Sequence, residues 1–221
     1  MADGPPPVSH SACTVGRVTR LLLLRHGESE WNAAGRWQGW ADPTLSDLGR
    51  AQAAAAAKAL PGIDAVVSSD LQRAVETAAV IAHGLGLEPG GRHWGLRERD
   101  VGEWSGLTRF EIDERWPGWR DWAVRADGFV EPPGGETHGI FLDRTVTALG
   151  AVAKEHAGLT VVAVTHGGLI RMLERHLDLE PEAIPNLAGR WVTVGDSALE
   201  PGERVVLVDP EEIELTIPPP H

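Results

Sequence analysis

Short apolar runs alternate with segments of helical periodicity along this chain. Leu21–Leu24, Ala65–Val67 and Thr160–Val164 are continuous apolar runs, which is typical of strands buried on both faces. A helix is predicted from about Ser46, an N-cap residue, to the Pro61-Gly62 turn. The alternation therefore predicts strand–helix–strand units.

Further helices and strands follow from similar signals. Ser69 and Gln72 have capping-box spacing ahead of a helix expected to end at Gly84. A long helix is expected from near Thr137 towards His156, and LIRMLERHL continues the third apolar run with helical periodicity. Three C-terminal strands and two turns are also predicted: Trp191–Val194, Arg204–Val208 and Ile213–Ile217, with turns at Gly195-Asp196 and Pro201-Gly202.

The fold class follows from this order of elements. Buried strands alternating with helices favour a mainly parallel sheet covered on both faces, so we predict a three-layer α/β sandwich with a small helical lid insertion. We expect one domain over residues 18–217, because no linker or repeat interrupts it. Residues 1–17 and 218–221, rich in proline, are predicted to be tails, the first of them flexible.

Composition narrows the function. The formal net charge of -12 over 221 residues argues against nucleic-acid and anionic-membrane partners, both of which require a basic surface. The single cysteine, Cys13, excludes an intramolecular disulfide, and Leu21–Leu24, the longest apolar run near the N-terminus, is far too short to cross a bilayer. We therefore predict a cytoplasmic protein. An anionic substrate would need a local cluster of positive charge on this acidic chain.

Such a cluster is predicted at one edge of the sheet. The first strand ends in Arg25-His26, Arg73 lies in the first turn after the second strand, and His166 follows the third. Ligands of open α/β sheets bind at the carboxyl ends of the strands. Any one of these residues alone would more often be structural. Together, two guanidinium groups and two imidazoles predict a site for a multiply charged anion, and phosphate fits best.

The sequence also limits the candidate nucleophiles. A Gly-x-x-x-x-Gly-Lys-Ser/Thr loop, a cysteine-phosphatase loop and a His-Glu-x-x-His zinc helix are all missing from it. A neutral imidazole nitrogen can attack phosphorus if an acceptor holds its other nitrogen. His26 is the candidate, because Arg25 and the Gly27 turn surround it.

Several ordered motifs resemble the histidine phosphatase superfamily, in its phosphoglycerate-mutase-like branch. They are LLLLRHGESEWN, GRWQGW, SSDLQRAVETA, LRERDVGEWSG, PGGET with Arg144 downstream, and VTHGG. The resemblance implies that His26 becomes phosphorylated, with Glu98 as proton donor and His166 as second active-site histidine. It further implies phosphate ligation by Arg25 and Arg73, and substrate contacts at Asn32, Gln38, Gly39 and Gly167.

The predicted function is a metal-independent phosphatase for small phosphomonoesters, of the sugar-phosphate or phosphoglycerate type, working through a phosphohistidine. The resemblance also bears on the reaction, because mutases of this family carry a long insertion with basic residues between the corresponding motifs. Here the interval from Leu107 to Gly134 is short and has no lysine, so the resemblance favours hydrolysis over a phosphoglycerate-type mutase. That mutase and a non-catalytic phospho-ligand-binding protein are the alternatives. We expect no cofactor and no metal, a small phosphorylated metabolite as partner, and leave a homo-oligomer open. Most of the nine tryptophans should pack, with two or three lining the cleft mouth.

Overall fold

The computed structural model describes residues 18–125, 128–195 and 198–208, and there it contains one five-stranded sheet. The strand order is β2-β3-β1-β4-β5. Strands β1 (Thr19–Arg25), β2 (Ala65–Ser68) and β3 (Thr160–Thr165) run parallel. Strands β4 (Ala188–Val194) and β5 (Leu199–Val206) are antiparallel to their neighbours. The predicted mainly parallel sheet is confirmed.

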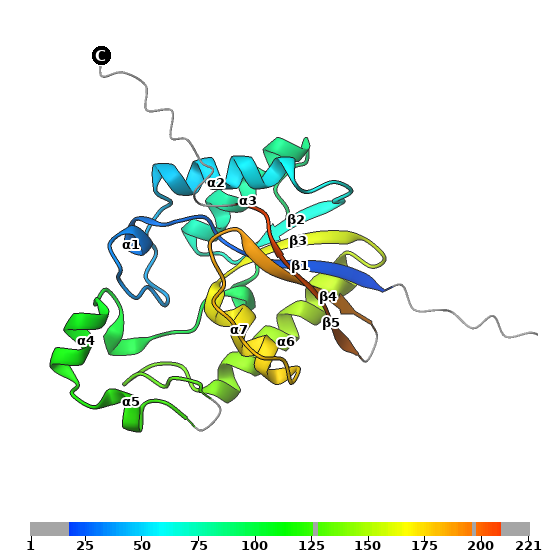
Figure 1. Cartoon of the computed structure of the whole chain (residues 1–221). Helices are drawn as coiled ribbons and strands as arrows, with labels where there is room; N and C mark the ends of the chain where they lie inside the picture. The colour runs from blue at the N-terminus through cyan, green and yellow to red at the C-terminus, as the bar shows by residue number, and fades with distance from the viewer. Residues whose placement is uncertain (1–17, 126–127, 196–197, 209–221) are drawn as a thin grey trace, which may run out of the picture.

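Helices cover both faces of this sheet, as Figure 1 shows. Helices α2 (Asp47–Lys58) and α3 (Gln72–Leu85) lie on one face. Helices α6 (His138–Glu155) and α7 (Gly167–His176) lie on the other. The three-layer sandwich is therefore confirmed.

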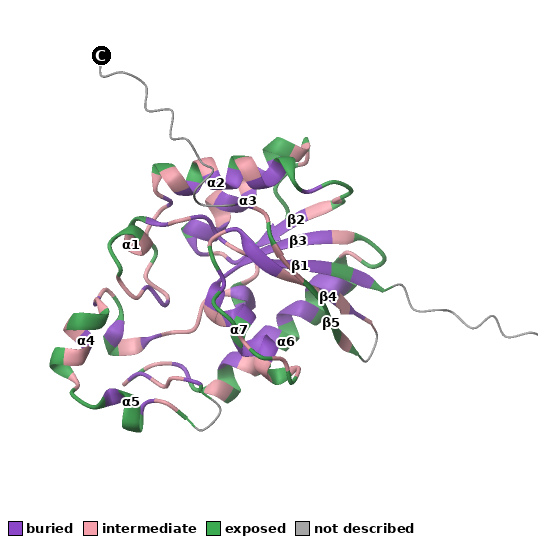
Figure 2. Cartoon of the chain, in the orientation of Figure 1, coloured by how far each residue is buried: buried purple, intermediate pink, exposed green. Residues whose placement is uncertain are grey.

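The central strand shows why its run of leucines is uninterrupted. Successive side chains of a strand point to opposite faces, and in β1 both faces are buried (Figure 2). Leu22 and Leu24 pack in the cluster under α2 and α3, whereas Leu21 and Leu23 pack in the cluster under α6 and α7. These two hydrophobic clusters fix the position of β1, whose carboxyl end carries the site.

Smaller elements form the loops at the carboxyl end of the parallel strands. They are α1 (Glu30–Ala33), the 3-10 turns η1 (Trp94–Leu96) and η2 (Gly102–Trp104), α4 (Arg109–Arg115) and α5 (Trp119–Trp122). Figure 1 places α1, α4 and α5 at the same end of the molecule. The helical insertion is thus present.

Tryptophans form the core of this insertion. The fully buried Trp104 lies edge-on to Trp37, Trp119 and Trp122, with ring centroids 4.8–6.5 Å apart, and tilted against Trp116. Aromatic pairs in such arrangements contribute beyond the area that they bury. Packing is therefore the main role of these rings, as predicted.

Helix starts agree with the sequence with one exception. Ser46 and Thr137 accept hydrogen bonds from the first turns of α2 and α6, as expected of N-caps. The predicted capping box at Ser69 is wrong: α3 begins at Gln72 with Leu71 as its N-cap residue. The Ser69 hydroxyl instead accepts from the Leu71 backbone N–H, and this local turn delays the helix.

The C-terminal strands differ more from the prediction. Pro201-Gly202 lies inside β5 rather than in a turn, beside a register irregularity between Arg190 and Val192. An edge strand tolerates proline, because one row of its N–H groups has no ladder partner. The predicted strand at 213–217, part of the predicted 195–196 turn and both tails lie outside the described residues. Within the described ranges, no helix has the length and apolar character needed to cross a membrane.

Candidate active site

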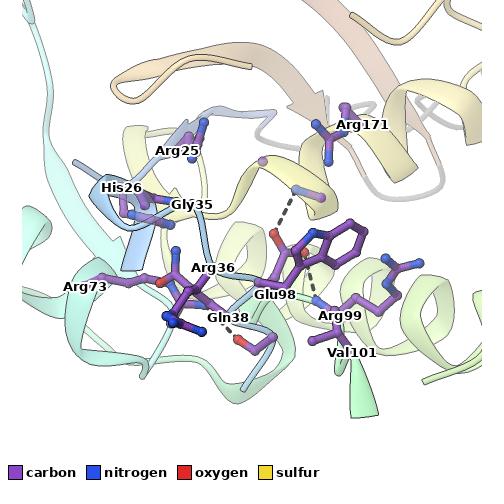
Figure 3. A pocket seen from close by; sticks show the side chains of 15 residues that line it. Arg25, His26, Gly35, Arg36, Gln38, Arg73, Glu98, Arg99, Val101 and Arg171 are labelled. Carbon is purple, nitrogen blue, oxygen red and sulfur yellow. Dashed lines mark hydrogen bonds between the residues drawn. The ribbon is translucent and has the colours of Figure 1, made fainter. Parts of the chain in front are cut away.

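A pocket of about 320 Å³ opens at the carboxyl end of β1 (Figure 3). It brings together residues that are far apart in the sequence, and eight of the nine predicted site residues line it. The eight are Arg25, His26, Asn32, Gln38, Gly39, Arg73, Glu98 and Gly167. His166, the ninth, packs directly against His26. Arg25 ends β1, His26 follows it directly, and His166 follows the end of β3. These positions agree with the prediction from the order of strands and helices.

The imidazole of His26 is held in one tautomer. Its Nδ1 lies 2.6 Å from the carbonyl oxygen of Gly27, which can only accept, so Nδ1 carries the proton. Burial is the main factor that lowers the pKa of His26 well below 6.5, followed by the positive charges of Arg73 and Arg25. The ring is therefore neutral, and Nε2 keeps its lone pair. This is the form that a nucleophilic histidine needs.

Backbone contacts fix the turn that carries His26. The N–H of Gly27 donates to Thr77 in α3 at 3.0 Å, and Asn186 donates to the His26 carbonyl at 2.9 Å. A Cβ on Gly27 would lie 2.5 Å from the Gly49 carbonyl oxygen. Glycine is required because the turn and the start of α2 approach this closely.

Two arginines flank the histidine, the buried Arg73 and the partly buried Arg25. Arg73 donates to the carbonyls of Gly39 and Ala41, both at 2.8 Å, while its buried Nε has no hydrogen-bond partner among the described residues. Arg25 donates to the Ile184 carbonyl at 2.6 Å. Burial lowers the pKa of each to about 10, and both remain charged at neutral pH. These two anchored cations can stabilise an oxyanion.

His166 supplies the second imidazole. Its ring centroid lies 5.2 Å from that of His26, with the two planes at 61°. Neither ring nitrogen of His166 has a hydrogen-bond partner in the described part of the chain, although the side chain is fully buried. Burial first, and Arg73 next, lower its pKa well below 6.5. An unpartnered buried imidazole beside two arginines fits the side of an anion cradle.

Glu98 lies against the first turn of α7 (Figure 3). Its carboxyl oxygens accept from the backbone N–H groups of Arg99 and Gly168, both at 2.9 Å. A Cβ on Gly168 would stand 2.2 Å from the carboxyl, so this position must be glycine for Glu98 to lie there. The carboxyl group is thereby held in the pocket wall.

A buried ion pair holds the segment that carries Glu98. Arg144 in α6 binds both carboxyl oxygens of Glu136, at 2.6 and 2.8 Å. The same guanidinium donates to the carbonyls of Gly95, Arg97 and Glu98, at 2.9–3.0 Å. Arg144 therefore sets the position of Glu98 through the backbone.

Three of the four predicted substrate contacts lie in α1 or in the segment just after it, and the fourth, Gly167, begins α7. Asn32 forms a capping box with Ser29, and the Ser29 hydroxyl donates to Gln38 at 2.9 Å. Gly39 has a φ of +51°, and a Cβ there would lie 2.7 Å from Val101. All three residues line the pocket with their positions fixed by this segment. Their roles in binding stay predictions.

Of the two or three tryptophans expected at the cleft mouth, Trp37 is the one that lines the pocket among the described residues. Sequence reasoning missed several other residues of the pocket wall, namely Gly35, Arg36, Arg99, Val101, Gly168 and Arg171. A signal for Arg171 was present, since it follows Gly168 by three residues in a predicted helix and so shares its face. Arg99 had no such signal, because only the fold turns it into the pocket. Among the described residues, no three His, Cys, Asp or Glu side chains gather as a possible metal-ligand set.

Residues 21–206 match the family model described as histidine phosphatase superfamily (branch 1). The chain belongs to this superfamily.

Known proteins with different activities resemble the chain. It is 38% identical over 210 residues to a glucosyl-3-phosphoglycerate phosphatase of Mycolicibacterium vanbaalenii, covering 87% of this chain and 91% of the relative. It is also 38% identical over 176 residues to a 2,3-bisphosphoglycerate-dependent phosphoglycerate mutase of Methylobacterium radiotolerans, covering 76% and 83%. The native structure of a mycobacterial glucosyl-3-phosphoglycerate phosphatase superposes with a TM-score of 0.66 at 34% identity, over 80% of this chain and 91% of that one.

Proposed function

We propose that this protein hydrolyses small phosphomonoesters through a phosphohistidine on His26, with Glu98 as proton donor and then acceptor. The observation that carries the proposal is the 2.6 Å contact from His26 Nδ1 to the Gly27 carbonyl. This contact leaves Nε2 unprotonated, in a pocket that also contains Arg25, Arg73 and Glu98.

The first step transfers the phosphoryl group to the enzyme. Nε2 of His26 forms a bond to phosphorus as the bond to the leaving oxygen breaks, and Glu98 gives its proton to that oxygen. Arg25, Arg73 and His166 bind the phosphoryl oxygens, where charge is spread in the transition state.

The second step returns the enzyme to its starting state. Glu98 takes a proton from water, the water oxygen bonds to phosphorus, and the N–P bond breaks with its electrons returning to Nε2. Inorganic phosphate leaves. No step in this sequence requires a metal ion.

Hydrolysis is favoured over isomerisation by the composition of the pocket wall. In the described part of the chain, no residue of the interval from Leu107 to Gly134 lines the pocket. The arginines of that interval that the structure describes thus lie outside the pocket wall, which supports hydrolysis over isomerisation. The mutase relative keeps this alternative open to a product assay: inorganic phosphate supports hydrolysis, and an isomerised ester supports the mutase.

The phosphatase relative, which shares most of the chain, suggests a phosphorylated metabolite such as a glucosylated phosphoglycerate as substrate. We further propose that the protein acts in the cytoplasm, as its single cysteine suggests. Cell fractionation with an antibody to the chain tests the location.

A trapping experiment tests the nucleophile. The wild type is mixed with a ³²P-labelled ester and quenched, and the label on the protein should be labile to acid and stable to alkali. The variant His26→Ala should carry no label and release no phosphate. Label that survives acid, or turnover by His26→Ala, would show that another group attacks. Loss of activity in EDTA, restored by one divalent ion, would contradict a metal-independent reaction.

A further inference from the structure

A second pocket, of about 470 Å³, lies between α6 and the segment of residues 92–95. It shares no lining residue with the catalytic pocket, and its volume is in the range that holds a small molecule. A Cβ on Gly95 would lie only 2.6 Å from the Cβ of Ala148, so η1 and α6 pack directly against each other. Because its walls are fixed in this way, the second pocket is preformed.

Trp94 gives the second pocket a flat apolar wall. The residue is 49% exposed, yet its ring lies edge-on to Trp40, with ring centroids 6.1 Å apart, and the Arg144 guanidinium lies 5.4 Å from its centroid. An aromatic ring that is held in place and still exposed can bind another ring at a small cost in conformational entropy. The second pocket therefore fits a ligand with a planar apolar group.

Polar groups without a partner lie around this ring. Arg92 and Asp143 are exposed in the pocket wall, and neither forms a hydrogen bond or an ion pair with another described residue. The buried Nε2 of His93 has no hydrogen-bond partner in the same part of the chain, since the Glu155 carboxyl is 3.9 Å away. Buried polar atoms in folded proteins normally have a partner, so His93 indicates a polar group in the ligand.

The two charges have opposite signs and indicate which polar groups the ligand carries. The Arg92 guanidinium matches a carboxylate, which it can bind with two parallel hydrogen bonds. The Asp143 carboxylate can only accept, so it favours an ammonium group and repels a phosphate. A molecule with a planar ring, a carboxylate and an ammonium group is an aromatic amino acid.

The second pocket is linked to the proton donor through one oxygen atom. The carbonyl oxygen of Glu98 accepts from Trp40 Nε1 at 2.8 Å and from the Arg144 guanidinium at 2.9 Å. Trp94 contacts both of these donors. A ligand that covers the exposed part of Trp94 therefore restricts the two groups that hold the Glu98 backbone.

We propose that the second pocket is an activating site for a free aromatic amino acid, with its ring on Trp94, its carboxylate on Arg92 and its ammonium group on Asp143. Binding raises kcat, because a more rigid backbone holds the Glu98 carboxyl in position for proton transfer. KM changes little, because the ligand touches no residue that lines the catalytic pocket. The activation rests on the proposed function, in which Glu98 is the proton donor, whereas the binding does not.

Calorimetry with four small molecules tests the site. L-phenylalanine carries all three groups, whereas 3-phenylpropionate lacks the ammonium group, phenethylamine lacks the carboxylate and L-alanine lacks the ring. We expect L-phenylalanine to bind about tenfold more tightly than each of the others, as one charge-assisted or stacking contact gives. An analogue that binds as tightly as L-phenylalanine, or L-phenylalanine that does not bind, would overturn the proposal.

Two surface variants assign the charges. Arg92→Gln should weaken the binding of L-phenylalanine roughly tenfold but not that of phenethylamine, which has no carboxylate. Asp143→Asn should weaken the binding of L-phenylalanine by a similar factor but not that of 3-phenylpropionate. Arg115→Gln, which removes a positive charge from an exposed position of α4, should change none of these affinities. Equal affinities in all three variants would show that the ligand binds elsewhere.

The effect on the rate should depend on the leaving group. Saturating L-phenylalanine should raise kcat for glycerol 3-phosphate about fivefold, with KM nearly constant. It should raise kcat for p-nitrophenyl phosphate much less, because that leaving group departs without a proton from Glu98. Bound L-phenylalanine that changes both rates equally, or changes neither, would overturn the activation.

Binding to a variant that cannot turn over separates this inference from the proposed function. In His26→Ala, L-phenylalanine should bind as it does to the wild type, and the added Arg92→Gln should weaken it. Arg92-dependent binding without wild-type phosphatase activity keeps the site and refutes the proposed function. Phosphatase activity without Arg92-dependent binding does the reverse.

Discussion

The Glu98 carboxyl and the Gly168 backbone N–H are joined by a hydrogen bond of 2.9 Å at the start of α7. This bond ties the predicted proton donor to the helix that begins directly after His166. A small change at the glycine should therefore act on the chemistry.

We expect Gly168→Ala to lower kcat by about 100-fold, because the new methyl group would lie 2.2 Å from the carboxyl and displace it. Steady-state kinetics measures the effect. Gly150→Ala is the matched control: a Cβ there has no neighbour within 4 Å, so stability should rise by about 0.5–1 kcal/mol with kcat unchanged. Equal kinetics for the two variants would contradict the assigned position of Glu98.

Replacing the Glu98 carboxyl should make the rate depend strongly on the leaving group of the substrate. Glu98→Gln should lower kcat/KM for alkyl phosphates by roughly 100- to 10,000-fold, and much less for p-nitrophenyl phosphate, whose leaving group departs without a proton. The exposed Glu103→Gln should alter neither rate. A uniform loss for both esters would mean that Glu98 does not donate the proton.

Stability should fall in acid because two buried imidazoles are neutral in the folded protein. The pKa values of His26 and His166 are both lowered well below 6.5, so below pH 6.5 the unfolded chain binds two more protons than the folded one. The free energy of unfolding should then decrease by up to about 2.7 kcal/mol per pH unit, until the folded-state values are reached. Urea titrations from pH 7 to pH 5 measure this slope.

Single variants separate the two contributions. His26→Gln and His166→Gln should each remove about half of the slope, and the double variant nearly all of it. A double variant with the wild-type slope would place the acid sensitivity elsewhere.

The ion pair behind Glu98 should matter to both stability and rate. Arg144→Met leaves Glu136 buried without its partner, which should cost about 3–5 kcal/mol and lower kcat through the loosened Glu98 segment. Arg144→Met with Glu136→Gln should cost less, because no charge stays unpaired. Chemical unfolding compares the two. A double variant less stable than the single one would contradict this account.

The sequence predicts the centre of this site because strand order controls it. Apolar runs buried on both faces imply parallel strands, and parallel strands bring the residues after them to one edge. Arg25, His26 and His166 are placed by that rule alone. Glu98 is different, because no strand or helix periodicity places it in the site. Only the resemblance of its motif, LRERDVGEWSG, predicts its role as proton donor.

The wall of the pocket is less predictable from the sequence, because it depends on how long side chains from different loops pack against one another. Arg99 turns inward because Phe129 and Val130 pack behind it, a contact between segments thirty residues apart. At Pro201 the local sequence misleads. Pro201-Gly202 is typical of a turn, but the pair lies in the edge strand β5, where a proline is tolerated.

The tryptophan core also gives the protein an internal optical reporter. The chain has nine tryptophans and no tyrosine, so indole groups dominate its intrinsic ultraviolet fluorescence. Trp37 lines the pocket and lies 5.4 Å from Trp104, the centre of the cluster. Anything that enters beside Trp37 changes the surroundings of a ring in contact with that cluster, so ligand occupancy can be followed by intrinsic fluorescence without any label.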